Sequence, residues 1–144
     1  DAGQYIYDYT VVAVRQHLQS HYSEPVSTKA GWLSITDRVE AEWAVEFTES
    51  SISFSSDERG GSVLTGDEGI SENAVIKYQI DVPKSGRYKL EYRVAAIRDT
   101  KGFEVYIGDK SKGMNPVFTT GDYHEYQTQQ GEEIFLEKGK NILI

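Results

Sequence analysis

Residues 75–94 read VIKYQIDVPKSGRYKLEYRV, which is two alternating runs on either side of a turn. In the first run apolar and polar side chains alternate. In the second run every other side chain is charged, at Arg87, Lys89, Glu91 and Arg93. Successive side chains of a strand point to opposite faces, so each run predicts a strand with one buried and one solvated face. The turn Pro83-Lys84-Ser85-Gly86 between them predicts that the two strands form an antiparallel hairpin.

Shorter runs of the same kind surround this stretch. They lie at residues 39–47, 52–54, 103–107, 117–118, 123–128, 134–136 and 141–144. Gly60, Gly61 and Gly66 interrupt the chain before the central stretch. Many short strands separated by turn residues predict an all-β fold, a sandwich or a barrel, rather than an α/β fold.

The composition limits what the chain can do. Its 144 residues, 38% of them hydrophobic, are enough for one packed domain. The formal net charge of −8 argues against nucleic acid, whose phosphates are held by Lys and Arg, and against an anionic membrane surface. No apolar run approaches the length that spans a bilayer. Because the chain has no cysteine, disulfides and thiolate metal sites are excluded.

The N-terminal part differs from the rest. Residues 1–15 contain the alternating run YIYDYTVVA, which predicts a strand. Residues 16–36 are mostly polar and predict a linker, which leaves residues 37–144 for the sandwich. Residues 141–144 are strand-like and apolar, so we expect either that the chain has been cut there or that they pair with another segment, such as residues 5–11.

Few residue patterns suggest catalysis. The chain has several carboxylate pairs, but chance pairs are expected among 23 acidic residues, and acid-base chemistry needs buried, perturbed carboxylates. There is no Gly-x-Ser-x-Gly elbow and no glycine-rich phosphate loop. His17 and His21 stand at helical spacing without the remaining residues of a zinc motif, so we interpret them as surface residues.

Two patterns suggest binding instead. On a strand, Glu40 and Glu42 would share one face, where they would either hold calcium or form an outward charged face. After the turn at 119–122, Tyr123 and Tyr126 are either an exposed platform for a sugar ring or packing residues. His124 is either a polar contact in such a site or an ordinary outward residue.

Four stretches together resemble the family 6 carbohydrate-binding modules and their family 35 relatives. They are VEAEW at residues 39–43, AVIKYQIDVPKSGRYKLEYRVAA at 74–96, TGDYHEY at 120–126 and LEKGKNIL at 136–143. The likeness covers about residues 37–144. Its most specific part is V-P-x-S-G-x-Y-x-L-x-x-R-V-A in combination with the E-A-E opening.

The resemblance implies a jelly-roll β-sandwich that binds polysaccharide without cleaving it, usually as part of a secreted glycoside hydrolase. It also implies a structural calcium, with Glu40 and Glu42 at positions where family members have ligands. Tyr123 falls where the family has a Trp or Tyr that stacks on the sugar. The chain departs from the family at Gly69, where a second cleft aromatic is common, and it stops before the family's closing strand.

Residues 6–12 look like that closing strand, which leaves two alternatives. The run belongs either to the end of an adjoining module or to this sandwich. In the second case it completes the sandwich within the chain or by exchange between chains, and Asp8 joins Glu40 and Glu42 at calcium.

We therefore expect an all-β, antiparallel β-sandwich of jelly-roll type, acting outside the cell as a non-catalytic module. It would target an attached glycoside hydrolase to a plant or algal cell-wall polysaccharide. The expected sugar-binding residues are Tyr123, Tyr126, His124, Asp122, Glu72 and Asn73. The alternatives are a structural or adhesion sandwich that has lost sugar binding, and a small glycoside hydrolase that uses two of the acidic residues.

Overall fold

The structure is a computed structural model that describes residues 5–9, 14–15, 18–19, 26–36, 38–54, 62–65 and 70–144. Its strands are β1 (Tyr5–Tyr9), β2 (Val14–Arg15), β3 (Leu18–Gln19), β4 (Val26–Ala30), β5 (Leu33–Ser34), β6 (Glu46–Phe47), β7 (Ser51–Phe54), β8 (Ser62–Thr65), β9 (Ile76–Val82), β10 (Gly86–Val94), β11 (Thr100–Ile107), β12 (Lys110–Val117), β13 (Gln127–Leu136) and β14 (Gly139–Leu143). One short 3-10 helix, η1 (Ala41–Trp43), precedes β6. Among the described residues, no helix is long and apolar enough to cross a membrane.

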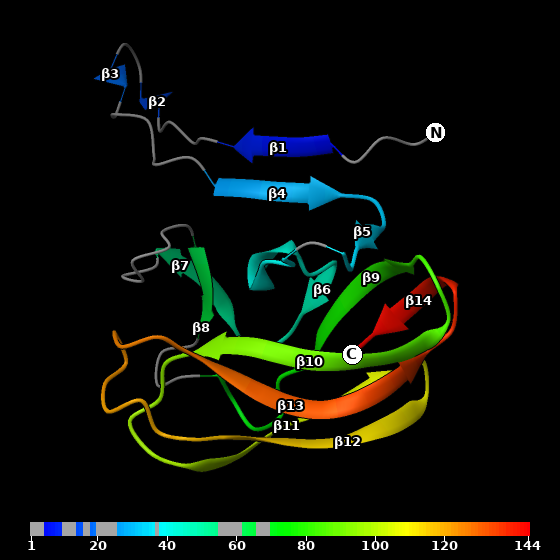
Figure 1. Ribbon diagram of the computed structural model, residues 1–144. Coiled ribbons are helices and arrows are strands. Elements are labelled where there is room, and N and C mark those ends of the chain that lie inside the picture. The colour runs from blue at the N-terminus through cyan, green and yellow to red at the C-terminus, as the bar shows by residue number, and fades with distance from the viewer. Residues whose placement is uncertain are drawn as a thin grey trace.

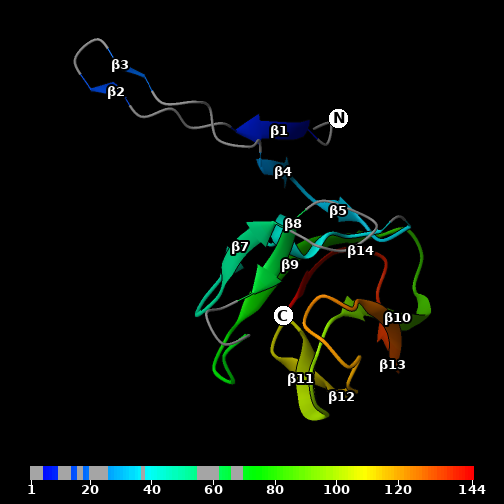
Figure 2. The ribbon, with the colours of Figure 1, turned by 90° about the vertical axis from the view of Figure 1, so that its left-hand side faces the viewer.

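Eight of the described strands form two layers, and the others form the separate pairs β1-β4, β2-β3 and β7-β8. In the larger sheet the order is β12-β11-β14-β9-β5, and β6 pairs with β9 as a sixth strand. The other layer is the antiparallel pair β10-β13, which lies in front of the larger sheet in Figure 1 and to its right in Figure 2. Apart from β5, which runs parallel to β9, the ladders of both layers are antiparallel. The predicted all-β sandwich is confirmed.

The two alternating runs of residues 75–94 are strands, but the predicted hairpin is wrong. β9 pairs with β14, β5 and β6, whereas β10 pairs with β13 in the other layer. The turn after Val82 therefore carries the chain from one layer to the other. Alternation shows which side chains share a face of a strand, but it does not show which strands pair. Both runs point their apolar faces at the same core, from opposite sides.

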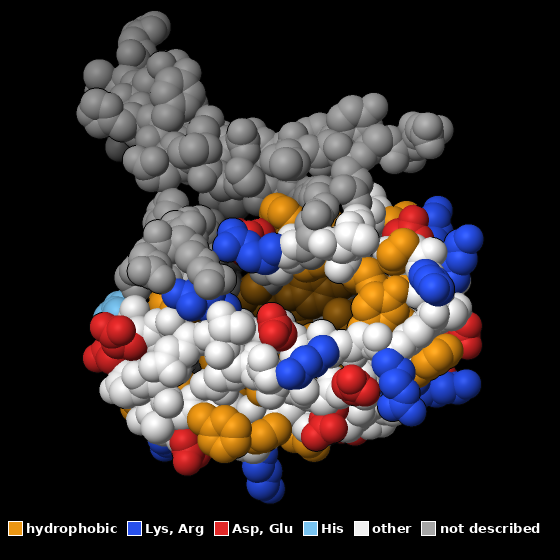
Figure 3. Space-filling view, viewed as in Figure 1, with side chains coloured by type: hydrophobic (Ala, Val, Ile, Leu, Met, Phe, Trp, Pro, Cys, Tyr) orange, Lys and Arg blue, Asp and Glu red, His pale blue; other side chains and the backbone are white. Residues whose placement is uncertain are grey.

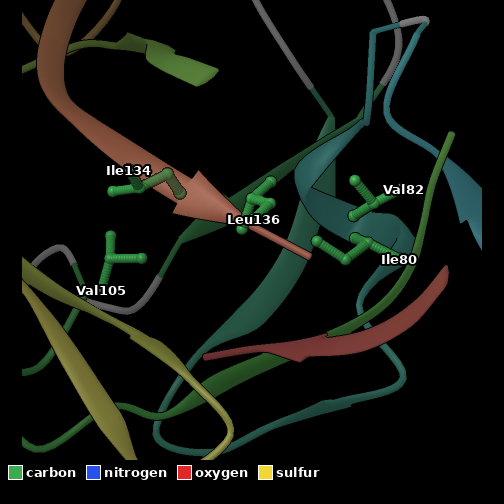
Figure 4. Packing of buried hydrophobic residues seen from close by; sticks show 5 residues of the cluster. All are labelled: Ile80, Val82, Val105, Ile134 and Leu136. Carbon is green, nitrogen blue, oxygen red and sulfur yellow. The ribbon is translucent and has the colours of Figure 1, made fainter. Parts of the chain in front are cut away.

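That core lies between the two layers. Ile80 and Val82 of β9 and Val105 of β11 face Ile134 and Leu136 of β13, and all five are at most 5% exposed (Figure 4). Half-buried side chains from both layers pack around this cluster: Ile35, Tyr78, Tyr88, Leu90, Ile107 and Leu143. The predicted apolar faces of β9 and β10 thus meet in one core.

The N-terminal predictions need correction. β14 pairs with β9 and β11, and β1 pairs with β4 from Tyr5↔Ala30 to Tyr9↔Val26, so the expected pairing of residues 141–144 with residues 5–11 is wrong. The predicted linker contains β4 and β5, and β5 joins the larger sheet. Residues 10–13, 16–17 and 20–25 lie outside the described residues, as does the side chain of Asp8. Completion of the sandwich by the N-terminal run stays a prediction.

Candidate functional site

The loop between β12 and β13 carries the predicted sugar platform. Asp122 folds it, because one carboxylate oxygen of Asp122 accepts a hydrogen bond from the His124 amide at 2.8 Å and its carbonyl accepts one from the Glu125 amide at 3.4 Å. The tight turn leaves the Tyr123 side chain 51% exposed. Of the residues predicted here, Asp122 and His124 are exposed, while Tyr126 is half-buried.

Two threonines fasten this loop to the neighbouring loop after β10. The Thr120 hydroxyl accepts the Ala96 amide at 2.9 Å and the Thr120 amide donates to the Ala96 carbonyl at 2.7 Å. The Thr119 amide donates to Asp99 Oδ1 at 2.8 Å, and the Thr119 hydroxyl donates to the Ala96 carbonyl at 3.1 Å. We call the set Ala96, Asp99, Thr119 and Thr120 the loop clip. It holds two loops at one end of the sandwich side by side.

The base of the same loop is closed by a glutamine. Gln129 Oε1 accepts the Phe118 amide at 2.9 Å, and Gln129 Nε2 donates to the Phe118 carbonyl at 2.7 Å. One side chain thus satisfies both backbone groups of Phe118, as a neighbouring strand would. The Phe118 ring is 56% exposed, so the loop presents two exposed aromatic side chains, Phe118 and Tyr123. The sequence analysis missed Phe118, although its position just before the turn was a usable signal.

Glu72 and Asn73 lie in a different loop, directly before β9. The Asn73 amide donates to the Ser71 hydroxyl at 3.3 Å, and that hydroxyl donates to Glu49 Oε2 at 2.5 Å. These contacts fasten residues 71–73 to the segment before β7, and both predicted side chains are exposed. Gly69, where the family has a second cleft aromatic, lies outside the described residues.

The predicted carboxylate pair is not on a strand. Glu40 is the N-cap of η1 and Glu42 lies within the helix, so the argument from strand alternation is wrong for this pair. The two carboxylates have different surroundings. Glu40 forms an ion pair with Arg38 at the surface, whereas Glu42 is only 8% exposed.

Tyr78 of β9 lies next to the buried carboxylate. Its hydroxyl donates to the Ala41 carbonyl at 2.9 Å. Burial raises the pKa of Tyr78 well above its usual range, and the negative charge of Glu42 raises it further. Glu42 is therefore a carboxyl group held inside the protein near a neutral phenol.

The fit to calcium rests on Glu42. Ca²⁺ takes several oxygen ligands, and a buried carboxylate is strongly stabilised by a bound cation. Within the part of the chain whose side chains are described, no three or more His, Cys, Asp or Glu residues cluster as a metal site. Glu40 lies two residues before Glu42 but forms an ion pair with Arg38, so Glu42 is the better placed of the two predicted ligands.

The perturbed carboxylate Glu104 does not resemble a catalytic acid. Hydrogen bonds from Ser111 and Tyr106 lower its pKa, and the side chain lies at the surface. A general acid at neutral pH needs a raised pKa instead.

The comparisons with known proteins agree with this architecture. A family model described as carbohydrate binding module (family 6) matches residues 40–143. A search of curated proteins found no match.

Several solved structures share the fold. A β-1,3-glucan-binding family 6 module from Bacillus halodurans has a TM-score of 0.65 and 20% identity, with 79% of this chain and 86% of that chain covered. A family 6 module of lichenase 5A from Cellvibrio mixtus, in complex with cellotriose, has a TM-score of 0.60 and 22% identity, with 73% and 81% covered. A family 35 module from Clostridium thermocellum has a TM-score of 0.62 and 16% identity, with 72% and 79% covered.

Proposed function

Because the chain belongs to family 6 of the carbohydrate-binding modules, we propose that it is a non-catalytic module that binds a cell-wall polysaccharide outside the cell and holds an attached glycoside hydrolase close to it. One similar module is named as part of a lichenase, which supports the proposed attachment. The alternative of a small glycoside hydrolase has no comparable support, since family 6 modules bind glycans without catalysis.

The observation that carries the proposal is the exposed Tyr123 ring on a fastened loop. Sugar rings present apolar C–H faces that stack on aromatic side chains, and the phenol adds a polar contact. A platform that is already fixed loses little conformational entropy when it binds. The loop clip and Gln129 supply that fixation.

Polar groups around the ring would set the orientation of the sugar. We assign this role to His124 and Tyr126 in the same loop, with Glu72 and Asn73, in the loop before β9, contacting a longer glycan. Asp122 acts mainly by folding the turn, since its carboxylate holds the His124 amide. Phe118 is an added candidate for a second stacking ring.

The glycan that we propose is a β-linked glucan of plant or algal walls. The supporting observation is that two of the similar modules are described as binding β-1,3-glucan and cellotriose. Because identities of 20% and 22% carry the fold and not the ligand, a panel of polysaccharides is needed.

A structural calcium is part of the proposal. Glu42 would be its main carboxylate ligand, with Glu40 contributing if Arg38 releases it, and Asp8 as a third ligand predicted from the family resemblance. The ion would neutralise the buried carboxylate and fasten η1 to the sandwich. It would not touch the sugar.

Affinity electrophoresis against soluble polysaccharides tests the proposal. We expect one glycan class to retard the wild type and Tyr123→Ala to abolish the retardation. Phe135→Ala is the matched control, because Phe135 is equally exposed, at 50%, but lies on β13. If no glycan retards the wild type, or Tyr123→Ala is retarded like the wild type, the Tyr123 platform is refuted and a structural or adhesion role gains ground.

A further inference from the structure

An exposed apolar strip runs along β12, the first strand in the order of the larger sheet, and ends directly after it. Met114 and Phe118 are 46% and 56% exposed, and Pro116 between them is exposed as well. Asn115 is 1% exposed and Val117 is half-buried, so these alternate residues face the other way. Figure 3 shows hydrophobic side chains along the lower margin of the molecule, where Figure 1 places β12. We call Met114, Pro116 and Phe118 the β12 strip.

The backbone under the β12 strip is held by side-chain hydrogen bonds to the front layer. The Tyr92 hydroxyl of β10 donates to the Pro116 carbonyl at 2.6 Å. The Asn115 side chain accepts a backbone amide of β13 at 2.9 Å, and Gln129 of β13 bonds both backbone groups of Phe118. The strip is therefore fixed before any ligand arrives, which lowers the entropy cost of binding to it.

The β12 strip leads directly into the loop that carries Tyr123. Residues 119–122 alone separate Phe118 from Tyr123, and the loop clip holds two of them, Thr119 and Thr120. A strand rises about 3.3 Å per residue, so the distance along β12 from Met114 to Phe118 is about 13 Å. The exposed apolar surface next to the proposed sugar platform is thus longer than one aromatic ring.

The chemistry of the β12 strip favours the apolar faces of an uncharged glycan. Single apolar side chains are common on protein surfaces, but a row of them beside a binding loop is typical of a ligand site. None of the three side chains carries a charge or a hydrogen-bond donor. Linked sugar rings present C–H faces that pack on such side chains as they stack on an aromatic ring.

We propose that the β12 strip extends the sugar site, so that the glycan chain that stacks on Tyr123 continues over Phe118 toward Met114. This inference rests on the proposed function and narrows its ligand to the interior of a long, uncharged polysaccharide chain. Tyr123 contacts every bound oligosaccharide, whereas Phe118 and Met114 contact only the sugars that a short oligosaccharide lacks.

Isothermal titration with cello- and laminari-oligosaccharides, from the disaccharide to the hexasaccharide, tests the extension. We expect the affinity of the wild type to rise with chain length. Phe118→Ala should lower the affinity for the hexasaccharide roughly fivefold and leave that for the disaccharide unchanged within about twofold. Met114→Ala should act in the same direction with a smaller effect. Gln129 bonds the backbone of residue 118, so Phe118→Ala removes the ring and keeps the base of the loop.

Two further variants separate this inference from the proposed function. Phe135→Ala removes an equally exposed ring from the front layer and should match the wild type at every length, while Tyr123→Ala should weaken binding at every length. The β12 strip is refuted if Phe118→Ala binds the hexasaccharide like the wild type, or if it weakens the disaccharide as much as the hexasaccharide. If Tyr123→Ala binds like the wild type and Phe118→Ala alone loses the long chains, the platform is refuted and the strip stands.

The wild type also gives a decisive result. An affinity that does not rise with chain length refutes the β12 strip. A wild type that binds none of these oligosaccharides refutes the strip and the choice of a β-linked glucan together, whereas electrophoresis over the panel of polysaccharides still tests the Tyr123 platform.

Discussion

Asn115 is a buried polar residue that fixes the spacing between strands. It is 1% exposed, and its side-chain oxygen accepts the Glu132 amide at 2.9 Å. Two glycines make room for it. A Cβ at Gly131 would lie 2.0 Å from Asn115 Oδ1, and one at Gly102, whose φ is +74°, would lie 1.8 Å from the Asn115 carbonyl oxygen. A side chain at either glycine would overlap an atom of the buried Asn115.

Gly131→Ala should therefore destabilise the protein by about 1–3 kcal/mol, since the new methyl group overlaps a buried side chain that cannot move without losing its hydrogen bond. Urea unfolding followed by fluorescence measures the change. The control is Gly86→Ala, where no atom lies within 4 Å of the added Cβ and φ is not positive. Equal stabilities of the two variants would contradict this account of Asn115.

Tyr78 predicts a pH dependence. Its pKa in the folded protein is raised above the ordinary tyrosine value of 10.0, so the unfolded chain loses this proton at lower pH than the folded one. The contribution to stability is thus fully present below pH 10 and is lost as the pH rises from there toward the folded pKa.

We expect the free energy of unfolding to fall above pH 10, and to fall less steeply in Tyr78→Phe. Urea titrations at a series of pH values measure both slopes. Parallel slopes in the two proteins would show that Tyr78 ionises as freely in the folded state as in the unfolded one.

At the scale of the elements, the proposed sugar binding by the loop of residues 118–126 requires the hydrogen bonds that hold the loop as well as the Tyr123 ring. The Thr120 hydroxyl accepts the Ala96 amide and donates to the Asp122 carbonyl at 3.0 Å, so it connects the clip to the turn that carries Tyr123. Loss of this hydroxyl would loosen the turn without altering the ring.

Thr120→Val keeps the shape of the side chain and removes these bonds. We expect glycan affinity to fall roughly fivefold, equivalent to about 1 kcal/mol, because the platform must be ordered on binding. Isothermal titration with the glycan identified by electrophoresis provides the measurement. Thr128→Val, an exposed change at the start of β13, is the control. An unchanged affinity in Thr120→Val would mean that the clip does not hold the platform.

The strands could be predicted from sequence, but their partners could not. The alternation of apolar and polar residues in 75–94 identified β9 and β10 and their core faces, because this pattern depends only on residues within the same strand. It could not show that the turn after Val82 leads to the other layer, since a tight turn serves a hairpin and a crossing between layers equally well.

The candidate site could likewise be predicted only where it depends on neighbouring residues in the sequence. The sequence left Tyr123 and Tyr126 as either an exposed platform or packing residues; in the structure Tyr123 is exposed and Tyr126 is half-buried. The loop clip was missed, because it joins Thr119 and Thr120 to residues 20 to 24 positions earlier. Glu40 and Glu42 fall in a 3-10 turn that their spacing alone could not distinguish from a strand.

For the whole molecule, the proposed structural calcium makes a prediction about stability. If Glu42 is its principal ligand, chelation leaves a carboxylate buried without its counter-ion, which costs free energy of folding.

We expect EDTA to lower the melting temperature by about 5 °C or more and added Ca²⁺ to restore it. Glu42→Gln should abolish this response, whereas Glu40→Gln should reduce it only in part. Differential scanning fluorimetry is sufficient for all three proteins. If EDTA leaves the wild-type melting temperature unchanged, the chain holds no structural calcium.

The crossing between layers after Val82 also affects how the protein folds. Because β9 and β10 leave the turn for different sheets, neither can pair with its neighbour in the chain. Gly86 pairs with Leu136, and Val82 with Gly139. Each ladder closes a long loop before it gains any contact, which is the topology of slow folders. On the ribosome, β9 would be synthesised well before β14, and β10 well before β13. Their apolar faces would have to remain protected from other chains until those strands emerge.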